Sequence, residues 1–413
     1  MAQVNLTLEQ EELLELLAGN REEAFKHLVE KLLNQVLLAE SSEQLQADPY
    51  ERSDNRKDYR NGSRERTLTT RIGTIELEVP RHRNKPFQTM LFDNYKRSEA
   101  ALINTMVEMV INGVSTRKVS RVIEQLCGTE ISKSFVSEAC KQLDPDIEAF
   151  RKQPLDDKEF PFLMVDAAYF KVREDHRIIS KALMLAIGYT FEGKREVVGF
   201  NVYDDESNPT WFDFLSDLKS RGLHGVMMIT SDAHPAILNS IVKVFPGVPW
   251  QRCQFHFTRN IIDAAPKSQQ AGLAIELREL FTSSTIEDAR RRKSEILRDY
   301  SDVASKAMDI LDNGFEDSMT VMNLPEEVRI QLRTSNAIER INRELKRRSE
   351  VIKVFPNAAS LLRLMGTVVI EYNDSLSMSK AVFYKRTPNE LASDVKAKLK
   401  EIAYTQKSLL SVC

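Results

Sequence analysis

Cysteine is scarce in this sequence of 413 residues, which contains only Cys127, Cys140, Cys253 and Cys413. Their separations lack the spacing of a disulfide framework, and so few thiols favour a reducing compartment. Long apolar runs are also missing, because no stretch approaches the roughly 18 apolar residues that cross a bilayer. The first residues, MAQVNLTLEQEELLELL, lack the basic and apolar segments of a signal peptide. We therefore expect a cytoplasmic protein without a membrane partner.

Net charge of one sign is nearly absent, because 58 Lys and Arg face 61 Asp and Glu and leave −3. A generally basic surface is thereby excluded, but the charges are distributed in blocks. Residues 1–50 carry ten acids and three Lys or Arg. Residues 52–85 carry ten Lys or Arg and five acids. Residues 329–348 carry seven Lys or Arg and two acids. Each basic block indicates either a local phosphate contact or a solvated face.

The length predicts two or three domains, and 42% hydrophobic residues are ample for their cores. Apolar spacing predicts helices over residues 7–17 and 21–39, so residues 1–47 are expected to pack or oligomerise. Residues 48–67 are rich in Arg, and we interpret them as a basic arm. Its Arg60 and Arg64 would follow a phosphate backbone, unless the arm is a mobile connector. Alternating apolar residues then predict a small β-hairpin.

Two short helices with a turn at Cys127 and Gly128 are predicted over residues 115–143. Ser115 and Ser132 are suitable N-caps, and a Gly-containing turn between short helices is typical of a helix-turn-helix. Many helical hairpins share this pattern without binding DNA, so a DNA-binding region over residues 48–150 is a hypothesis. The second helix would present these polar side chains to a major groove: Lys133, Ser134, Ser137, Glu138 and Lys141.

Residues 143–160 contain two prolines and many acids, and are the expected domain boundary. Beyond them, short apolar runs and helical periodicity predict an α/β domain in the order β-β-β-α-β-α-β-α. Short links predict that the first three strands form an antiparallel meander. The predicted strands occupy residues 160–172, 177–190, 196–204, 226–230 and 248–253.

Residues 267–330 have helical spacing throughout and no strand pattern. We expect them to form an all-α insertion between two parts of the α/β domain, residues 160–266 and 331–375. One helix is expected over residues 335–352, and residues 376–413 should form a helical tail.

Asp166 and Asp232 follow strongly apolar strands, Asp166 at or near the exit of the first and Asp232 after the fourth. If these strands are neighbours, both carboxylates lie at one edge of the sheet. A third acid should come from the helix over residues 335–352, where Glu339 and Glu344 both qualify. The alternative is a set of ordinary surface or capping acids.

Helical geometry favours Glu339 over Glu344. Seven residues turn a helix through about 700°, so Glu339 and Lys346 share a face, with Arg343 one turn from Glu339. A carboxylate ringed by these cations suits a metal ligand beside a phosphate. Glu344 projects elsewhere and should pair with Arg340 or Arg348.

Three carboxylates suit hard divalent cations such as Mg²⁺ or Mn²⁺, which bind carboxylate, phosphate and water oxygens. Two such ions in one site activate an attacking hydroxyl and stabilise the leaving oxygen of an in-line phosphoryl displacement. These residues therefore indicate metal-dependent phosphoryl transfer on nucleic acid.

Cys253 and His256 form a C-x-x-H pair, which supplies two of the four ligands of a structural zinc. Since no second pair has matching spacing, we prefer a packed strand-to-helix corner with His256 near the catalytic edge. His234 follows Asp232 by two residues and either contacts a phosphate or caps the helix at Pro235.

Four segments resemble the Mutator-type transposases of bacterial insertion sequences: MVDAAYFKVRED, ITSDAH, PWQRCQFHFTRN and TSNAIERINRELKRRSEVIKVFPN. The likeness extends from about Arg21 to Tyr384. It implies an α/β ribonuclease H-like catalytic domain with an all-α insertion, after a mainly α DNA-binding region that contains a small β-hairpin. It implies that Asp166, Asp232 and Glu339 form the DDE triad.

The resemblance also implies that Cys253 and His256 are the C-x-x-H pair of that family, and that Lys346 is its basic residue seven positions after the Glu. Members bind the terminal inverted repeats of their own element, then cut and join DNA strands with Mg²⁺. We expect a nucleoid-associated DNA transposase, and a homodimer because two element ends require two active sites. Two rivals are a nuclease that cannot join strands and an inactive DNA-binding regulator. The expected DNA contacts near the acids are Arg340, Arg343, Lys346, His234, Cys253 and His256.

Overall fold

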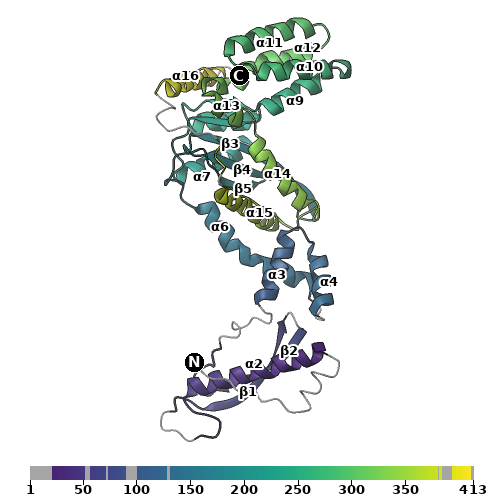
Figure 1. The fold of residues 1–413 in the computed structure, drawn as a ribbon, viewed down its shortest axis with the longest axis vertical. Helices are drawn as coiled ribbons and strands as arrows, with labels where there is room; N and C mark the ends of the chain where they lie inside the picture. The colour runs from purple at the N-terminus through teal and green to yellow at the C-terminus, as the bar shows by residue number, and fades with distance from the viewer. Residues whose placement is uncertain are drawn as a thin grey trace. The chain divides into compact units, whose positions relative to one another are not determined.

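The chain forms two compact units, Met1–Gln142 and Leu143–Cys413 (Figure 1). The computed structural model describes residues 21–51, 56–70, 73–89, 100–127, 131–379, 381–383 and 393–410. The predicted helix over residues 7–17 and the break near Pro388 lie outside these ranges. Within them, no helix is long and apolar enough to cross a membrane.

The first unit contains helix α2 (Arg21–Leu45) and an antiparallel hairpin of β1 (Arg60–Thr70) and β2 (Gly73–His82). The predicted hairpin is present, but β1 begins at Arg60, inside the segment that we interpreted as a basic arm. The first half of this strand is exposed and its side chains are polar, so the sequence shows no apolar alternation there; only the far end of the strand is buried. Apolar side chains of the hairpin pack against α2: Leu37 with Leu68, Ile75, Leu77 and Val79.

The same unit contains α3 (Ala100–Ile111), α4 (Thr116–Cys127), α5 (Lys133–Ala139) and the 3₁₀ helix η1 (Cys140–Leu143). The two predicted short helices are therefore present, although the second divides into seven α-helical residues and a 3₁₀ turn. The Ser132 hydroxyl caps α5 by accepting a hydrogen bond from the Phe135 amide at 3.1 Å. A small core joins the three α-helices: Leu102, Met106, Val119, Ile123, Ile131 and Val136.

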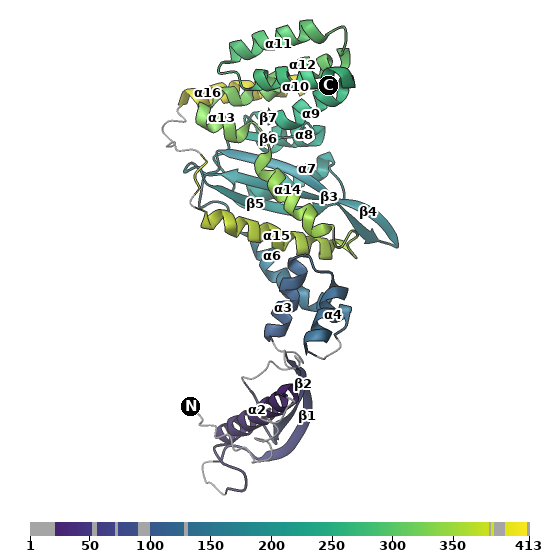
Figure 2. The ribbon, with the colours of Figure 1, turned by 45° about the vertical axis from the view of Figure 1, so that its right-hand side comes forward.

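A five-stranded sheet is the centre of the second unit (Figure 2). Its strands are β3 (Phe162–Glu174), β4 (Arg177–Tyr189), β5 (Arg195–Tyr203), β6 (Met228–Ser231) and β7 (Trp250–Arg252), in the order β5-β4-β3-β6-β7. The first three form the predicted antiparallel meander, while β6 runs parallel to β3 and to β7. The first and fourth strands are thus neighbours, which brings the chain after β6 beside β3.

Helices cover both faces of this sheet because its strands are apolar on both sides. One core packs the sheet against α6 (Asp144–Lys152), α14 (Asn336–Ser349) and α15 (Ala358–Met378). The other core packs it against α7 (Asn208–Ser220) and α8 (Pro235–Val244). Helix α6 lies within the segment that we expected to be a domain boundary, and it belongs to the second unit.

The insertion is helical, as predicted, and has its own hydrophobic core. Helices α10 (Lys267–Phe281), α11 (Ile286–Tyr300) and α12 (Ser305–Ser318) form this core together with α9 (Gln254–Ala264), which precedes the predicted start of the insertion at residue 267. The 3₁₀ helix η2 (Thr320–Asn323) and α13 (Glu326–Leu332) then return the chain to the sheet. After α15, helix α16 (Ser393–Leu410) is the last described element.

Candidate active site

Asp166 was expected at or near the exit of the apolar run, but it lies in the interior of β3, which stays paired with β4 as far as Glu174, two residues beyond the predicted end at Val172. Its pairing with β6 is much shorter and ends at Met164 opposite Thr230. Continuing that parallel register by two residues would place Asp166 level with Asp232. The sheet therefore brings the two carboxylates to one place, as expected, although the strand itself runs on.

Asp232 follows β6 directly, and one of its carboxyl oxygens has no hydrogen-bond partner among the described residues. Its Oδ1 atom is buried and accepts no hydrogen bond from any described residue. The backbone beside it is held firmly, since Ser231 Oγ donates to the Asp232 carbonyl at 2.8 Å and accepts from Trp250 Nε1 at 2.9 Å. A buried carboxylate without a donor is unfavourable unless a cation compensates it.

The carboxylate of Asp166 accepts two hydrogen bonds. The Ala167 amide donates to Oδ1 at 2.9 Å, and Asn342 Nδ2 of α14 donates to Oδ2 at 2.8 Å. Burial and the negative charge of Asp232 nevertheless raise the pKa of Asp166 to about 7. A buried carboxylate whose ionisation is disfavoured by a neighbouring carboxylate is a suitable place for a divalent cation, which would remove the repulsion.

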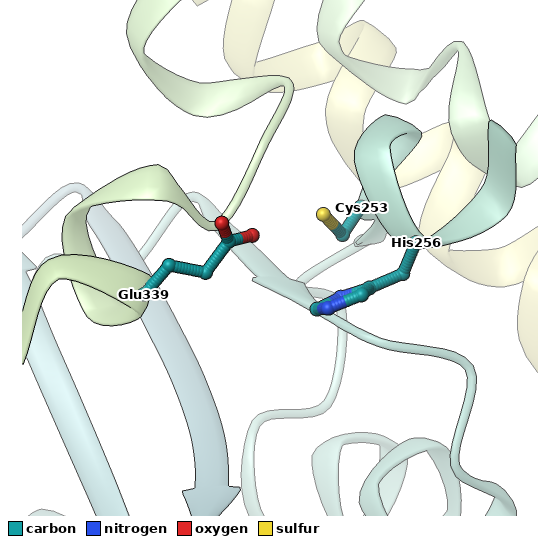
Figure 3. A group of neighbouring side chains, drawn as sticks. All are labelled: Cys253, His256 and Glu339. Atoms are coloured by element: carbon teal, nitrogen blue, oxygen red, sulfur yellow. The ribbon is translucent and has the colours of Figure 1, made fainter. Parts of the chain in front are cut away.

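Glu339 lies in the first turn of α14, one turn before Asn342. Its Oε1 accepts a hydrogen bond from Ser335 Oγ at 3.1 Å. Figure 3 shows its carboxylate directed toward Cys253 and His256 of the α9 N-terminus, and ligand atoms of the three residues lie within 4.8 Å of one another. Helix α14 thus carries Glu339 to Cys253 and His256, and one turn later it carries Asn342 to Asp166.

Glu344, the other candidate for the third acid, is paired with arginines. Arg347 Nε and Arg348 Nε each donate to its carboxylate at 2.8 Å, which confirms the predicted pairing with Arg348. Hydrogen bonds from Arg347 lower the pKa of Glu344 to about 2, helped by those from Arg348. A carboxylate already neutralised in this way is poorly suited to bind a metal ion.

A fourth carboxylate, that of Glu206, was missed by the sequence analysis. Burial raises its pKa, and the charge of Asp232 adds to this effect. Glu206 lies between β5 and α7 at the end of an acidic run, Asp204-Asp205-Glu206. Nothing in that run distinguishes the acid that faces the site, so no sequence signal identifies it.

Cys253 and His256 occupy the corner between β7 and α9. Cys253 is fully buried, and its Sγ accepts from the Ser335 amide at 3.3 Å. The pKa of His256 is raised to about 9, first by its hydrogen bond with Cys253 and further by the charges of Asp166 and Asp232. Among the described residues, Glu339 alone adds to the pair as a third metal-ligand candidate, so the four-ligand set of a structural zinc is incomplete.

His234 serves as the N-cap of α8, one of its two predicted roles. Its Nδ1 accepts a hydrogen bond from the Ala236 amide at 3.3 Å. The histidine lies near the acids, since it is one of the residues that influence the pKa of Glu206. Capping therefore accounts for this side chain without a phosphate.

The predicted cations of α14, Arg340, Arg343 and Lys346, are exposed. Across the part of the chain that the structure describes, Arg343 and Lys346 form no ion pair. The remaining predicted DNA contacts lie in the Met1–Gln142 unit, not with the acids. Arg60 is partly buried and donates to Ser42 Oγ at 2.8 Å. The others are exposed: Arg64, Lys133, Ser134, Ser137 and Lys141.

Comparison with known proteins assigns the chain to a family. Residues 1–379 match the family model described as Transposase, Mutator family. The chain is 41% identical over 379 residues to the transposase for insertion sequence element IS256 in transposon Tn4001 of Staphylococcus aureus, covering 91% of this chain and 96% of that protein.

Two further relatives come from other bacteria. The transposase for insertion sequence element ISRM5 of Rhizobium meliloti is 36% identical over 353 residues, covering 86% of this chain and 88% of the relative. That for IS1081 of Mycobacterium tuberculosis is 36% identical over 325 residues, covering 78% of each. The chain therefore belongs to the Mutator family of transposases.

Proposed function

We propose that this protein is the DNA transposase of an insertion sequence, which binds the terminal inverted repeats of its element, cuts the ends and joins them to target DNA. One observation carries the proposal above the others. The pairing of β3 with β6 supports a meeting of Asp166 and Asp232, and α14 supports Glu339 as the third acid, because the same helix carries Asn342 to Asp166. The strand order and the helices on both faces support a ribonuclease H-like fold for this domain.

Asp166, Asp232 and Glu339 would hold Mg²⁺ or Mn²⁺, with two ions in each active site. The donor set fits, because all three residues offer carboxylate oxygens and Asp232 Oδ1 is buried without a hydrogen-bond donor. When bound, such ions activate the attacking oxygen and stabilise the leaving oxygen of a phosphoryl displacement.

The other side chains position the reactants. Asn342 orients the Asp166 carboxylate through its 2.8 Å hydrogen bond. The exposed Arg340, Arg343 and Lys346 bind DNA phosphates beside the acids. Two in-line displacements follow in order: water attacks at the element end and leaves a free 3′-hydroxyl, and that hydroxyl then attacks the target strand.

The Met1–Gln142 unit binds the element ends. The exposed polar face formed by Lys133 of α5 and Lys141 of η1 enters the major groove, and Arg64 on β1 contacts the phosphate backbone. Two element ends require two active sites, so the working form is a homodimer.

Strand cleavage and strand transfer on the terminal repeats of the element test this function. In Mg²⁺, the full-length protein should cut intact ends and should join pre-cleaved ends to target DNA. Asp166→Asn, Asp232→Asn and Glu339→Gln should each slow both steps by about 10³-fold or more, equivalent to ~4 kcal/mol of transition-state stabilisation, and should keep DNA binding.

Glu344→Gln is the matched control, because it removes a carboxylate of the same helix that is already paired with arginines. Its cleavage rate should stay within a few-fold of the unmodified protein. Cutting without any joined product would identify a nuclease, and unchanged cleavage by Asp166→Asn would favour a DNA-binding regulator. Loss of cleavage in Glu344→Gln but not in Glu339→Gln would mean that Glu344 is the third acid.

A further inference from the structure

The third acid reaches the site by a long route. Between Asp232 and Glu339 the chain leaves the sheet, builds the helical insertion and returns through α13. The carboxylate of Glu339 is useful only if the start of α14 is fixed against β6 and α9 to within a fraction of an ångström.

Hydrogen bonds fix the segment at which the chain returns. Thr230 Oγ1 on β6 donates to the Leu332 carbonyl at 3.0 Å, and the Gln254 amide donates to the Arg333 carbonyl at 2.9 Å. The Ser335 amide donates to Cys253 Sγ at 3.3 Å. Thr230, Cys253 and Ser335 are each at most 1% exposed, so water does not compete for these bonds.

Ser335 occupies the N-cap position of α14, but its hydroxyl does not bond as an N-cap side chain usually does. Its hydroxyl makes no capping bond to a backbone amide of α14. It donates instead to Glu339 Oε1 at 3.1 Å, and it lies 3.2 Å from Cys253 Sγ. Since the hydroxyl hydrogen is directed to the carboxylate, the Cys253 thiol donates to Ser335 Oγ. Cys253, Ser335 and Glu339 therefore form one hydrogen-bonded chain.

We propose that Cys253 and Ser335 are positioning residues, which hold the Glu339 carboxylate in the direction needed to bind a divalent cation with Asp166 and Asp232. This inference rests on the proposed function and adds a role for the cysteine of the C-x-x-H pair that needs no zinc. Without the hydrogen bond from Ser335, Glu339 has several staggered side-chain conformations available, most of which direct its carboxylate away from the cation.

The test compares four variants of the full-length protein. Ser335→Ala and Cys253→Ala break the hydrogen-bonded chain, whereas Cys253→Ser keeps a group that can donate and accept. Ser240→Ala is the matched control, because Ser240 is equally buried and its hydroxyl bonds to the Ala236 carbonyl within α8. Two quantities are measured: Mn²⁺ affinity by calorimetry without DNA, and the Mn²⁺ concentration that half-saturates joining of pre-cleaved ends.

Ser335→Ala and Cys253→Ala should weaken Mn²⁺ binding about 10- to 100-fold, the usual loss when a hydrogen bond to a metal ligand is removed. Saturating Mn²⁺ should restore the joining rate to within a few-fold. Cys253→Ser should lie near the unmodified protein, and Ser240→Ala should bind Mn²⁺ normally even if its unfolding temperature falls.

Unchanged Mn²⁺ affinity in both Ser335→Ala and Cys253→Ala would overturn the proposal. So would one zinc ion per chain in the purified protein that is lost from Cys253→Ser, because Cys253 would then be a metal ligand. If the unmodified protein binds Mn²⁺ but cuts and joins no DNA, the proposed function fails, while calorimetry still decides the role of Ser335.

Discussion

The carboxyl group of Asp166 lies where water is scarce and where Asp232 carries the same charge. Its pKa of about 7 exceeds the ordinary 3.8, so the folded protein keeps the proton after the unfolded chain has lost it. Between about pH 4 and pH 7 the unfolded state binds fewer protons, and stability falls as pH rises. Above pH 7 the ionised Asp166 carboxylate lowers the free energy of unfolding by its full amount.

Asp166→Asn should abolish this pH dependence. In EDTA, we expect the unmodified protein to lose about 2 kcal/mol relative to the variant between pH 5 and pH 8, after allowance for solvent screening. Unfolding temperatures measured across this range check the prediction, and added Mg²⁺ should raise the stability of the unmodified protein alone.

Glu344 contributes to stability with the opposite pH dependence to Asp166, so Glu344→Gln serves as the contrast. The pKa of Glu344 is lowered to about 2 from 4.5, so its contribution is present above pH 4.5 and is lost as pH falls toward 2. The variant should therefore be less stable than the unmodified protein at neutral pH.

For Asp166, equal pH profiles of stability in Asp166→Asn and the unmodified protein would show that this carboxyl group has an ordinary pKa.

At the scale of an element, α14 carries both cations without an ion pair in the described part of the chain and cations that are paired with Glu344. Arg343 and Lys346 are exposed and, within the described residues, form no ion pair, whereas Arg347 is bound to the Glu344 carboxylate. Exposed cations on the helix that also carries Glu339 are available to phosphates, and each phosphate contact releases counterions from DNA.

Arg343→Ala and Lys346→Ala should each weaken DNA binding and reduce the slope of log affinity against log salt by about 1. Arg347→Ala removes the same charge from the same helix and should leave the slope unchanged. Binding isotherms at several salt concentrations provide the measurement. A reduced slope in all three variants would indicate a general charge effect instead of phosphate contacts.

For the molecule as a whole, α6 marks where the second unit begins. Its Ile147 is 3% exposed within the sheet core, and its Asp144 accepts two hydrogen bonds of 2.6 Å from Arg363 of α15. Arg363 is itself 9% exposed, so loss of its partner leaves a nearly buried charge without compensation. Such a loss costs about 3–5 kcal/mol.

A fragment of residues 143–413 should therefore fold, while a fragment of residues 153–413 should be less stable by several kcal/mol because it lacks α6. Urea unfolding of the two fragments, followed by circular dichroism, tests this difference. Equal stabilities would place the boundary after α6, in the middle of the segment that the sequence indicated.

The order of elements was predictable because it depends on local patterns. Short apolar runs marked the five strands, and their short links predicted the meander. The choice between Glu339 and Glu344 also used local information alone, since the rotation of a single helix separates the two side chains. Arg340 and Arg348 each lie one turn from Glu344 and were both expected as partners for the same reason, and the structure pairs Glu344 with Arg348.

Contacts between distant segments required the tertiary structure. The sequence by itself determined that Asp166 and Asp232 each come after a run of apolar residues, because the order of apolar side chains along the chain predicts their burial. Only the folded chain decided that Glu206 is the acid of its run that interacts with Asp166 and Asp232, and that Cys253 bonds to Ser335. Each of these depends on strand register or on the return of the chain from the insertion, and neither leaves a periodic signal along the sequence.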